Sequence, residues 1–125
     1  MLKKPVNSPA KVNLFLKVIS KRPDGYHNIL SLVDIISLYD LISIEEIEND
    51  VVKVEDDKKV LPEGEANTIF RSAMLLKKMF NIRSGVKIFI EKHIPIGSGL
   101  GGPSSNAATV LKELVRIWDL KLSDN

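Results

Sequence analysis

The chain has 125 residues, the size of one ordinary domain, and its hydrophobic (44%) and charged (27%) fractions exclude a disordered or fibrous class. A formal net charge of +2, with basic residues spread along the chain, argues against nucleic acid as the main partner. With no cysteine and no charged-then-apolar leader, we expect a cytoplasmic protein without disulfides or thiolate metal sites. Apolar runs such as residues 38–44 are too short to cross a membrane.

The first half of the sequence is rich in strand patterns. Apolar and polar residues alternate along residues 6–19, which is the period of a strand with one buried face. Residues 22–25, Arg-Pro-Asp-Gly, predict a tight turn, because Pro fixes its own φ and Gly accepts a positive one. Residues 26–36, 41–47 and 51–54 are β-branched stretches that short polar turns should separate. We therefore expect an antiparallel, β-rich first half.

The second half alternates between helix and strand patterns. A charged connection over residues 55–65 precedes a helix that should begin near Asn67 and end near Asn81. A strand pattern over residues 86–90 follows, and a second helix should begin near Ser104. The residues expected to face the core from the two helices are Ile69, Ala73, Leu76 and Phe80, then Ala108, Leu111, Leu114, Val115 and Trp118. Residues 123–125 resemble the N-cap of another helix.

A glycine-rich loop connects that strand to the second helix. Residues 95–106 read Pro-Ile-Gly-Ser-Gly-Leu-Gly-Gly-Pro-Ser-Ser-Asn. Glycines let the backbone approach a ligand closely, and free amides at a helix start favour an anion, so the loop suits a phosphate. A plain flexible connection is the alternative, and the pattern Gly97-x-Gly99-x-x-Gly102 alone does not decide between them.

Two well-known phosphate-binding loops fit the sequence less well. A Walker P-loop has Lys directly after its last Gly, whereas here Pro103 and Ser104 follow. A Rossmann fingerprint is matched nominally, but its strand should be apolar on both faces and lead to a further strand with an acidic ribose ligand. We therefore rank ATP above a dinucleotide.

Residues 95–108 resemble the glycine-rich motif of the GHMP kinases, whose core is Pro-x-x-x-Gly-Leu followed by small residues, Ser-Ser and Ala. Residues 8–16 (Ser-Pro-Ala-Lys-Val-Asn-Leu-Phe-Leu) and 22–27 (Arg-Pro-Asp-Gly-Tyr-His) resemble opening motifs of the diphosphocytidyl-methylerythritol kinases within that superfamily. Residues 67–69, Asn-Thr-Ile, resemble the helix start between them. The resemblance implies an α+β domain of the ribosomal-protein-S5-domain-2-like type, a mainly antiparallel sheet with helices on one face.

The resemblance also implies a reaction and the residues that perform it. ATP would phosphorylate the tertiary 2-hydroxyl of a methylerythritol unit, with Mg²⁺ screening the phosphates. Lys11 would be catalytic, and Asn13 would hold the substrate beside it. Tyr26 and His27 would form a cytidine pocket. The residues implied in ATP binding are Pro95, Ile96, Gly97, Ser98, Gly99, Leu100, Gly101, Gly102, Pro103, Ser104 and Ser105.

Each of these residues also has a plainer interpretation. Without their motifs, Lys11 and Asn13 would be read as a solvated strand face, and Tyr26 and His27 as an ordinary strand start. His93 is interpreted as an exposed residue at a strand end. Pro103 departs from the family pattern, which usually has a third consecutive Gly there. Because Pro has no backbone N–H, it removes one possible hydrogen-bond donor to a phosphate from the loop.

We expect residues 1–125 to form one GHMP-kinase N-terminal ATP-binding domain that stops before the family's catalytic aspartate and C-terminal domain. No residue is assigned as a metal ligand, and the isolated chain is predicted to have no turnover. The expected partners are a cytidine diphosphate substrate and the missing C-terminal domain, with no nucleic acid and no membrane. The alternatives are another GHMP small-molecule kinase, or a non-catalytic nucleotide- or RNA-binding module of the same fold.

Overall fold

The computed structural model describes residues 5–122, so the helix start predicted at residues 123–125 lies outside the described residues. Its strands β1 (Val6–Lys21), β2 (His27–Ile47), β3 (Val52–Asp56) and β4 (Gly85–Glu91) form one sheet in the order β1-β2-β4-β3. The pairs β1–β2 and β2–β4 are antiparallel, and β3–β4 is parallel. The mainly antiparallel sheet expected from the sequence is thereby confirmed.

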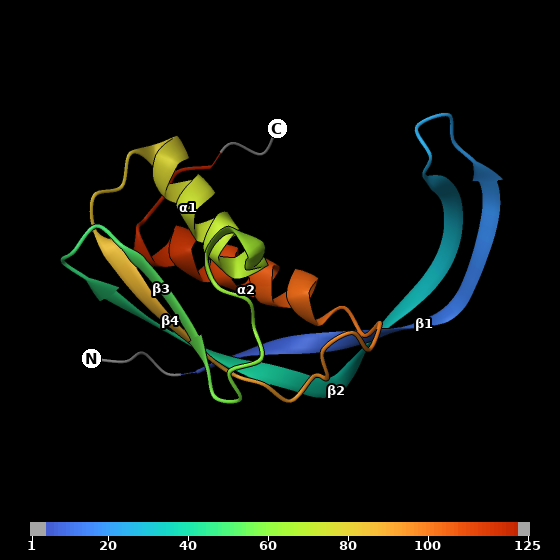
Figure 1. Cartoon of the computed structure of the whole chain (residues 1–125), viewed down its shortest axis with the longest axis horizontal. Helices are drawn as coiled ribbons and strands as arrows, with labels where there is room; N and C mark the ends of the chain where they lie inside the picture. The colour runs from blue at the N-terminus through green and yellow to red at the C-terminus, as the bar shows by residue number, and fades with distance from the viewer. Residues whose placement is uncertain (1–4, 123–125) are drawn as a thin grey trace.

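Helices α1 (Thr68–Phe80) and α2 (Gly102–Ile117) lie on one face of the sheet (Figure 1). A short 3₁₀ turn, η1 (Gly64–Ala66), precedes α1. The side chain of Asn67 accepts hydrogen bonds from the amides of Ile69 and Phe70, which caps α1 where the sequence predicted its start. At the other end Asn81 adopts the left-handed conformation that closes the helix. No helix within residues 5–122 is long and apolar enough to span a membrane.

The core lies between the sheet and the two helices. Its buried residues are Ile42 and Ile44 of β2, Val86, Ile88 and Ile90 of β4, Ile69, Ala73 and Leu76 of α1, and Val110 and Leu114 of α2. The prediction for Ala108 is wrong, because Ala107 is buried and Ala108 is exposed. Ala107 lies three residues before Val110 and seven before Leu114, so these three share one helical face. The rest of the predicted stripe is confirmed, since Leu114 is in the core and Leu111, Val115 and Trp118 pack against it.

β2 is one strand, and the turn expected between residues 36 and 41 does not exist. Residues 37–40 stay extended because they continue the ladder with β1, where Tyr39 lies opposite Pro9 and Asp40 opposite Ser8. Ser and Asp favour turns when they lie near the surface. Asp40, however, is fully buried and its carboxylate is bonded inside the domain.

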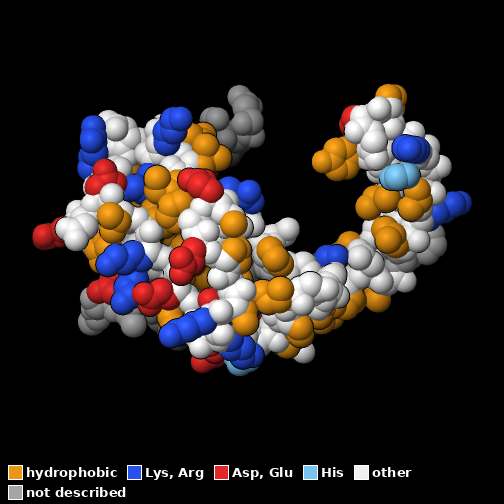
Figure 2. All heavy atoms as spheres, in the orientation of Figure 1, with side chains coloured by type: hydrophobic (Ala, Val, Ile, Leu, Met, Phe, Trp, Pro, Cys, Tyr) orange, Lys and Arg blue, Asp and Glu red, His pale blue; other side chains and the backbone are white. Residues whose placement is uncertain are grey.

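The outer parts of β1 and β2 form an arm that projects away from the helices (Figure 1). The predicted turn lies at its tip, where Gly25 has a φ of 90° and its amide donates to the Arg22 carbonyl oxygen at 3.1 Å. The buried face predicted for β1 is not observed on the arm, since Leu14, Leu16 and Val18 are 62%, 56% and 57% exposed. Neither helix extends over the arm, and Figure 2 shows apolar side chains gathered along it.

Candidate functional site

Lys11 of β1 contacts the glycine-rich loop at the start of α2. The backbone amide of Lys11 donates to the carbonyl oxygen of Leu100 at 2.8 Å, and its Nζ donates to the carbonyl oxygen of Gly99 at 3.2 Å. A cavity of about 330 Å³ lies at this contact. Its lining residues are Pro9, Ala10, Lys11, Ile35, Gly101, Ser104 and Ser105. A cation and the first turn of a helix therefore face one cavity.

The backbone conformation at position 101 requires glycine. Its φ is 75°, and a Cβ built there would lie 2.9 Å from Cγ of Lys11. Gly97 and Gly99 have positive φ angles of 70° and 75° as well, so alternate positions of the loop adopt a conformation that other residues rarely adopt. The loop therefore has a defined shape that its glycines make possible.

α2 begins at Gly102, two residues before the predicted start, with Gly101 as its N-cap. Hydrogen bonding within the helix begins with the amide of Ser105, which donates to the carbonyl oxygen of Gly101 at 2.9 Å. The amides of Gly102 and Ser104 precede it and belong to the set that helices offer to anions. Pro103 lies between them, at a helix position that proline favours, and contributes no amide.

A buried polar network, which the sequence analysis missed, lies beneath the loop. Oδ1 of Asp40 accepts hydrogen bonds from the backbone amides of His93 (2.6 Å) and Ile94 (2.8 Å). Oδ2 accepts from Nζ of Lys92 (2.6 Å) and Nδ2 of Asn106 (3.0 Å). Burial alone would raise the pKa of Asp40, but these hydrogen bonds together hold it below its ordinary value of 3.8. Asp40 is therefore a buried carboxylate that stays ionised.

The network continues to β1 through Ser8. Nδ2 of Asn106 donates to Oγ of Ser8 at 2.9 Å, and Oγ of Ser8 lies 3.0 Å from Oγ of Ser105. Ser8, Asp40, Lys92 and Asn106 are all at most 3% exposed. One sequence signal could have indicated Asp40, because it is a lone carboxylate within an apolar stretch of residues 38–44. No pattern in the sequence pairs it with Lys92.

The other predicted substrate residues lie on the arm and are not next to the loop. Oδ1 of Asn13 accepts a hydrogen bond from Oγ of Ser31 at 2.9 Å, across the two strands. Tyr26 is 72% exposed at the arm's turn, and His27 pairs with Lys21 where β2 begins. The structure thus brings Lys11 and the glycine loop together and leaves Tyr26 and His27 apart from them (Figure 1).

The loop also borders a smaller, mainly apolar cavity of about 200 Å³. Ile96 and Pro103 contribute to it from the loop side, and Leu61, Pro62 and Thr68 from the segment around the start of α1. Its mainly apolar walls are of the kind that line pockets for aromatic rings. His93, by contrast, is exposed at the end of β4, as interpreted from the sequence, with its Nε2 2.8 Å from Oε2 of Glu91.

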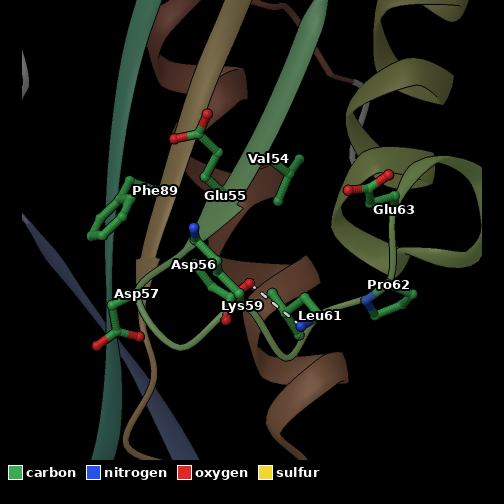
Figure 3. A pocket seen from close by; sticks show the side chains of 9 residues that line it. All are labelled: Val54, Glu55, Asp56, Asp57, Lys59, Leu61, Pro62, Glu63 and Phe89. Atoms are coloured by element: carbon green, nitrogen blue, oxygen red, sulfur yellow. Dashed lines mark hydrogen bonds between the residues drawn. The ribbon is translucent and has the colours of Figure 1, made fainter.

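A cavity of about 690 Å³ lies at the end of β3, and Lys11 is not among its lining residues. Figure 3 shows carboxylates around it, including Glu55, Asp57 and Glu63, with Lys59 as the only cation among its lining residues. Asp56 stabilises the bend after β3 by accepting from the amide of Leu61 at 3.4 Å. So many carboxylates repel a phosphate chain. Within residues 5–122, neither these carboxylates nor any other His, Asp and Glu side chains form a group of three or more that could hold a metal ion.

The part of the chain that contains the glycine-rich loop matches a known protein family. Residues 67–125 match the N-terminal domain of the GHMP kinases. The 4-diphosphocytidyl-2-C-methyl-D-erythritol kinase of Clostridioides difficile (strain 630) is 43% identical over 120 residues, which are 96% of this chain and 40% of that protein.

Solved structures of kinases match the fold of this chain. A crystal structure of 4-(cytidine 5'-diphospho)-2C-methyl-D-erythritol kinase matches with a TM-score of 0.79 at 36% identity, over 98% of this chain and 42% of that one. A crystal structure of mevalonate kinase shares the fold, with a TM-score of 0.69 at 20% identity. The chain spans about two-fifths of the length of the first two relatives.

Proposed function

We propose that the chain is the N-terminal domain of a GHMP kinase and provides the ATP-binding half of an enzyme that phosphorylates 4-diphosphocytidyl-2-C-methyl-D-erythritol. The observation that carries the proposal is the contact of Lys11 with the glycine loop at the start of α2. The relative of that name, at 43% identity, supports the substrate. Because the chain spans 40% of that relative, the activity of the whole enzyme is part of the proposal.

ATP binds, in this proposal, with its phosphates against residues 97–105. The amides of Gly102 and Ser104 and the dipole of α2 face the phosphates, and the ammonium of Lys11 exchanges the Gly99 carbonyl for a phosphate oxygen. The apolar cavity beside Ile96 and Pro103 takes the adenine ring. Mg²⁺ bound with ATP would supply further positive charge beside the phosphates. The chain's own residues thus supply positioning and positive charge.

The substrate lies along the face of β1 that carries Lys11, and the arm holds its cytidine end. Asn13 is two residues beyond Lys11, and Tyr26 and His27 are at the arm's turn with their side chains exposed. An aromatic ring and an imidazole suit stacking on a base and reading its polar edge. These assignments, and a cytoplasmic location for the enzyme, belong to the same proposal.

The proton of the reacting hydroxyl needs an acceptor. Among the described residues, those lining the Lys11 cavity include no carboxylate. We therefore propose that the base is the aspartate that the resemblance places after residue 125, in a part of the enzyme that also closes the substrate cleft. Without it the chain should bind ATP but show no turnover, because general-base help contributes typically 10²–10⁴-fold and a closed cleft contributes more.

Titration of the ¹⁵N-labelled chain with ATP tests the proposal. Amide shifts are expected to concentrate in residues 97–105, and they should move little when RNA is added at the same ionic strength. Shifts confined to the acidic cavity at the end of β3, with the loop unchanged, would contradict the site. A coupled ADP-release assay with the diphosphocytidyl substrate tests the reaction, and turnover by this chain alone would show that its base lies within residues 1–125.

A further inference from the structure

We propose that Asp40 is a positioning residue for the glycine loop, which holds the segments before and after the loop so that its backbone amides are presented to a phosphate. The inference rests on the proposed function in one respect, that the loop binds phosphates. Asp40 itself is fully buried and contacts no cavity at Lys11, so its effect is exerted through the loop.

The two oxygens of Asp40 bind the chain on opposite sides of the loop. Oδ1 accepts from the amides of His93 and Ile94, the residues immediately before Pro95. Oδ2 accepts from the side chain of Asn106, which follows the loop in the second turn of α2. One carboxylate therefore fixes where the loop begins and where it ends, and the ladder of β2 fixes that carboxylate.

The same network also sets the position of Lys11. Ser8 lies three residues before Lys11 on β1, and its hydroxyl accepts from Nδ2 of Asn106. Ser8 also lies within hydrogen-bond distance of Ser105 on α2. The strand that carries the cation and the helix that carries the amides are consequently attached to one buried group.

Stability alone does not explain this arrangement. A buried ion pair such as Asp40–Lys92 contributes little or nothing compared with apolar residues of similar volume. Here the carboxylate has hydrogen bonds from two backbone amides and two side chains, all directed at the loop's flanks. A buried carboxylate with this many directed partners specifies a geometry.

Two charge-neutral double variants isolate the effect of Asp40. Asp40→Asn with Lys92→Met retains an oxygen for the amides of His93 and Ile94, whereas Asp40→Ala with Lys92→Met removes it. Neither leaves a buried unpaired charge, which is the usual reason why such variants unfold. Lys77→Met is the control, because Lys77 is a buried lysine paired with Asp50 and lies on α1, away from the loop.

The first readout needs no nucleotide. Selective ¹⁵N-glycine labelling gives signals for the 7 glycines, of which Gly97, Gly99 and Gly101 report the loop while Gly25 and Gly64 serve as internal references. In the Asp40→Ala double variant we expect the order parameters of the loop glycines to fall below about 0.6, the range of flexible backbone. In the Asp40→Asn double variant and in Lys77→Met they should stay as in the unmodified chain.

The second readout is ATP affinity, with Kd expected to rise about tenfold in the Asp40→Ala double variant relative to the Asp40→Asn one, as for the loss of one to two hydrogen bonds. Equal loop dynamics in the two double variants, equal Kd values, or equal loosening by Lys77→Met would each overturn the inference. If the unmodified chain does not bind ATP, the proposed function fails and the glycine order parameters alone decide the inference.

A further variant covers the case in which the Asp40→Ala double variant does not fold. Asn106→Ala keeps the Asp40–Lys92 pair and should lower the order parameter of Gly101 but not that of Gly97. Unchanged order parameters at both glycines would overturn the inference.

Discussion

The ammonium of Lys11 donates a 3.2 Å hydrogen bond to the carbonyl oxygen of Gly99, although the two residues are 88 positions apart in the sequence. The amide of Lys11 is bonded to the next residue of the loop, Leu100, at 2.8 Å. Strand and loop are thus joined by the chain's own hydrogen bonds, and contacts of this kind reduce the free energy that a ligand loses to ordering the protein.

Replacing Lys11 with Met should weaken ATP binding about tenfold, because a charge-assisted hydrogen bond to a phosphate contributes about 1.5–3 kcal/mol and part of it is screened at this half-exposed position. Lys17→Met is the matched control, since Lys17 lies on the same strand but on the exposed arm. Isothermal titration at two salt concentrations measures both. An equal loss of affinity in the two variants would show that only the net charge matters.

Gly101→Ala should destabilise the domain by about 1–2 kcal/mol for its left-handed backbone alone, and further because its Cβ would contact the side chain of Lys11. Gly64→Ala separates the two effects, since Gly64 has a φ of 60° but open space around its Cβ position. Urea unfolding of both variants gives the difference. If they are equally destabilised, Lys11 moves aside at no cost and the contact is unimportant.

Addition of cytidine diphosphate should shift the imidazole proton signals of His27 and leave those of His93 unchanged. The chain has only these 2 histidines, so both are resolved in a simple proton spectrum and His27→Ala assigns them. His93 serves as the reference because its ring is bonded to Glu91, which pairs with Leu41, 14 residues along β2 from His27. A shift at His93 alone would place the cytidine site elsewhere.

The stability of the domain should depend on acid through Asp40. Its pKa is lower in the folded protein than the ordinary 3.8, so the unfolded chain takes up the proton first as the pH falls. The stabilisation from this group is therefore complete above pH 3.8 and is lost as the pH decreases through the lowered folded value. Urea midpoints measured from pH 6 downward should show this loss in the unmodified chain. The Asp40→Asn, Lys92→Met variant should lack that component.

The elements whose signals are local could be predicted from the sequence. Asn67 caps α1 through amides two and three residues away, and residues 22–25 close their turn through their own backbone. The alternation of residues 86–90 was sufficient for β4, because one face of that strand is fully buried. In each case the information lies within a few residues of the feature.

What could not be predicted depends on partners that are distant in sequence. Ser37 and Asp40 are residues that favour turns near a surface, and the pairing with β1 and the burial of Asp40 keep this segment extended. Asp40 and Lys92 are 52 positions apart, and no periodicity connects them. The exposure of Leu14 and Leu16 depends on how far the helices extend, which the strand pattern does not contain.

The hydrogen bond between Ser8 and Asn106 joins positions that are 98 residues apart, so it determines when the site can form during synthesis. Strand β1 can pair with β2 as soon as the arm's turn has been made, because that pairing is local. Its attachment to α2 closes a loop of almost the whole domain, which is entropically costly and slow. A ribosome-bound chain that ends before residue 106 therefore carries the Lys11 motif without the helix it must contact. The residues proposed to bind ATP are therefore brought together only after residue 106 has been synthesised.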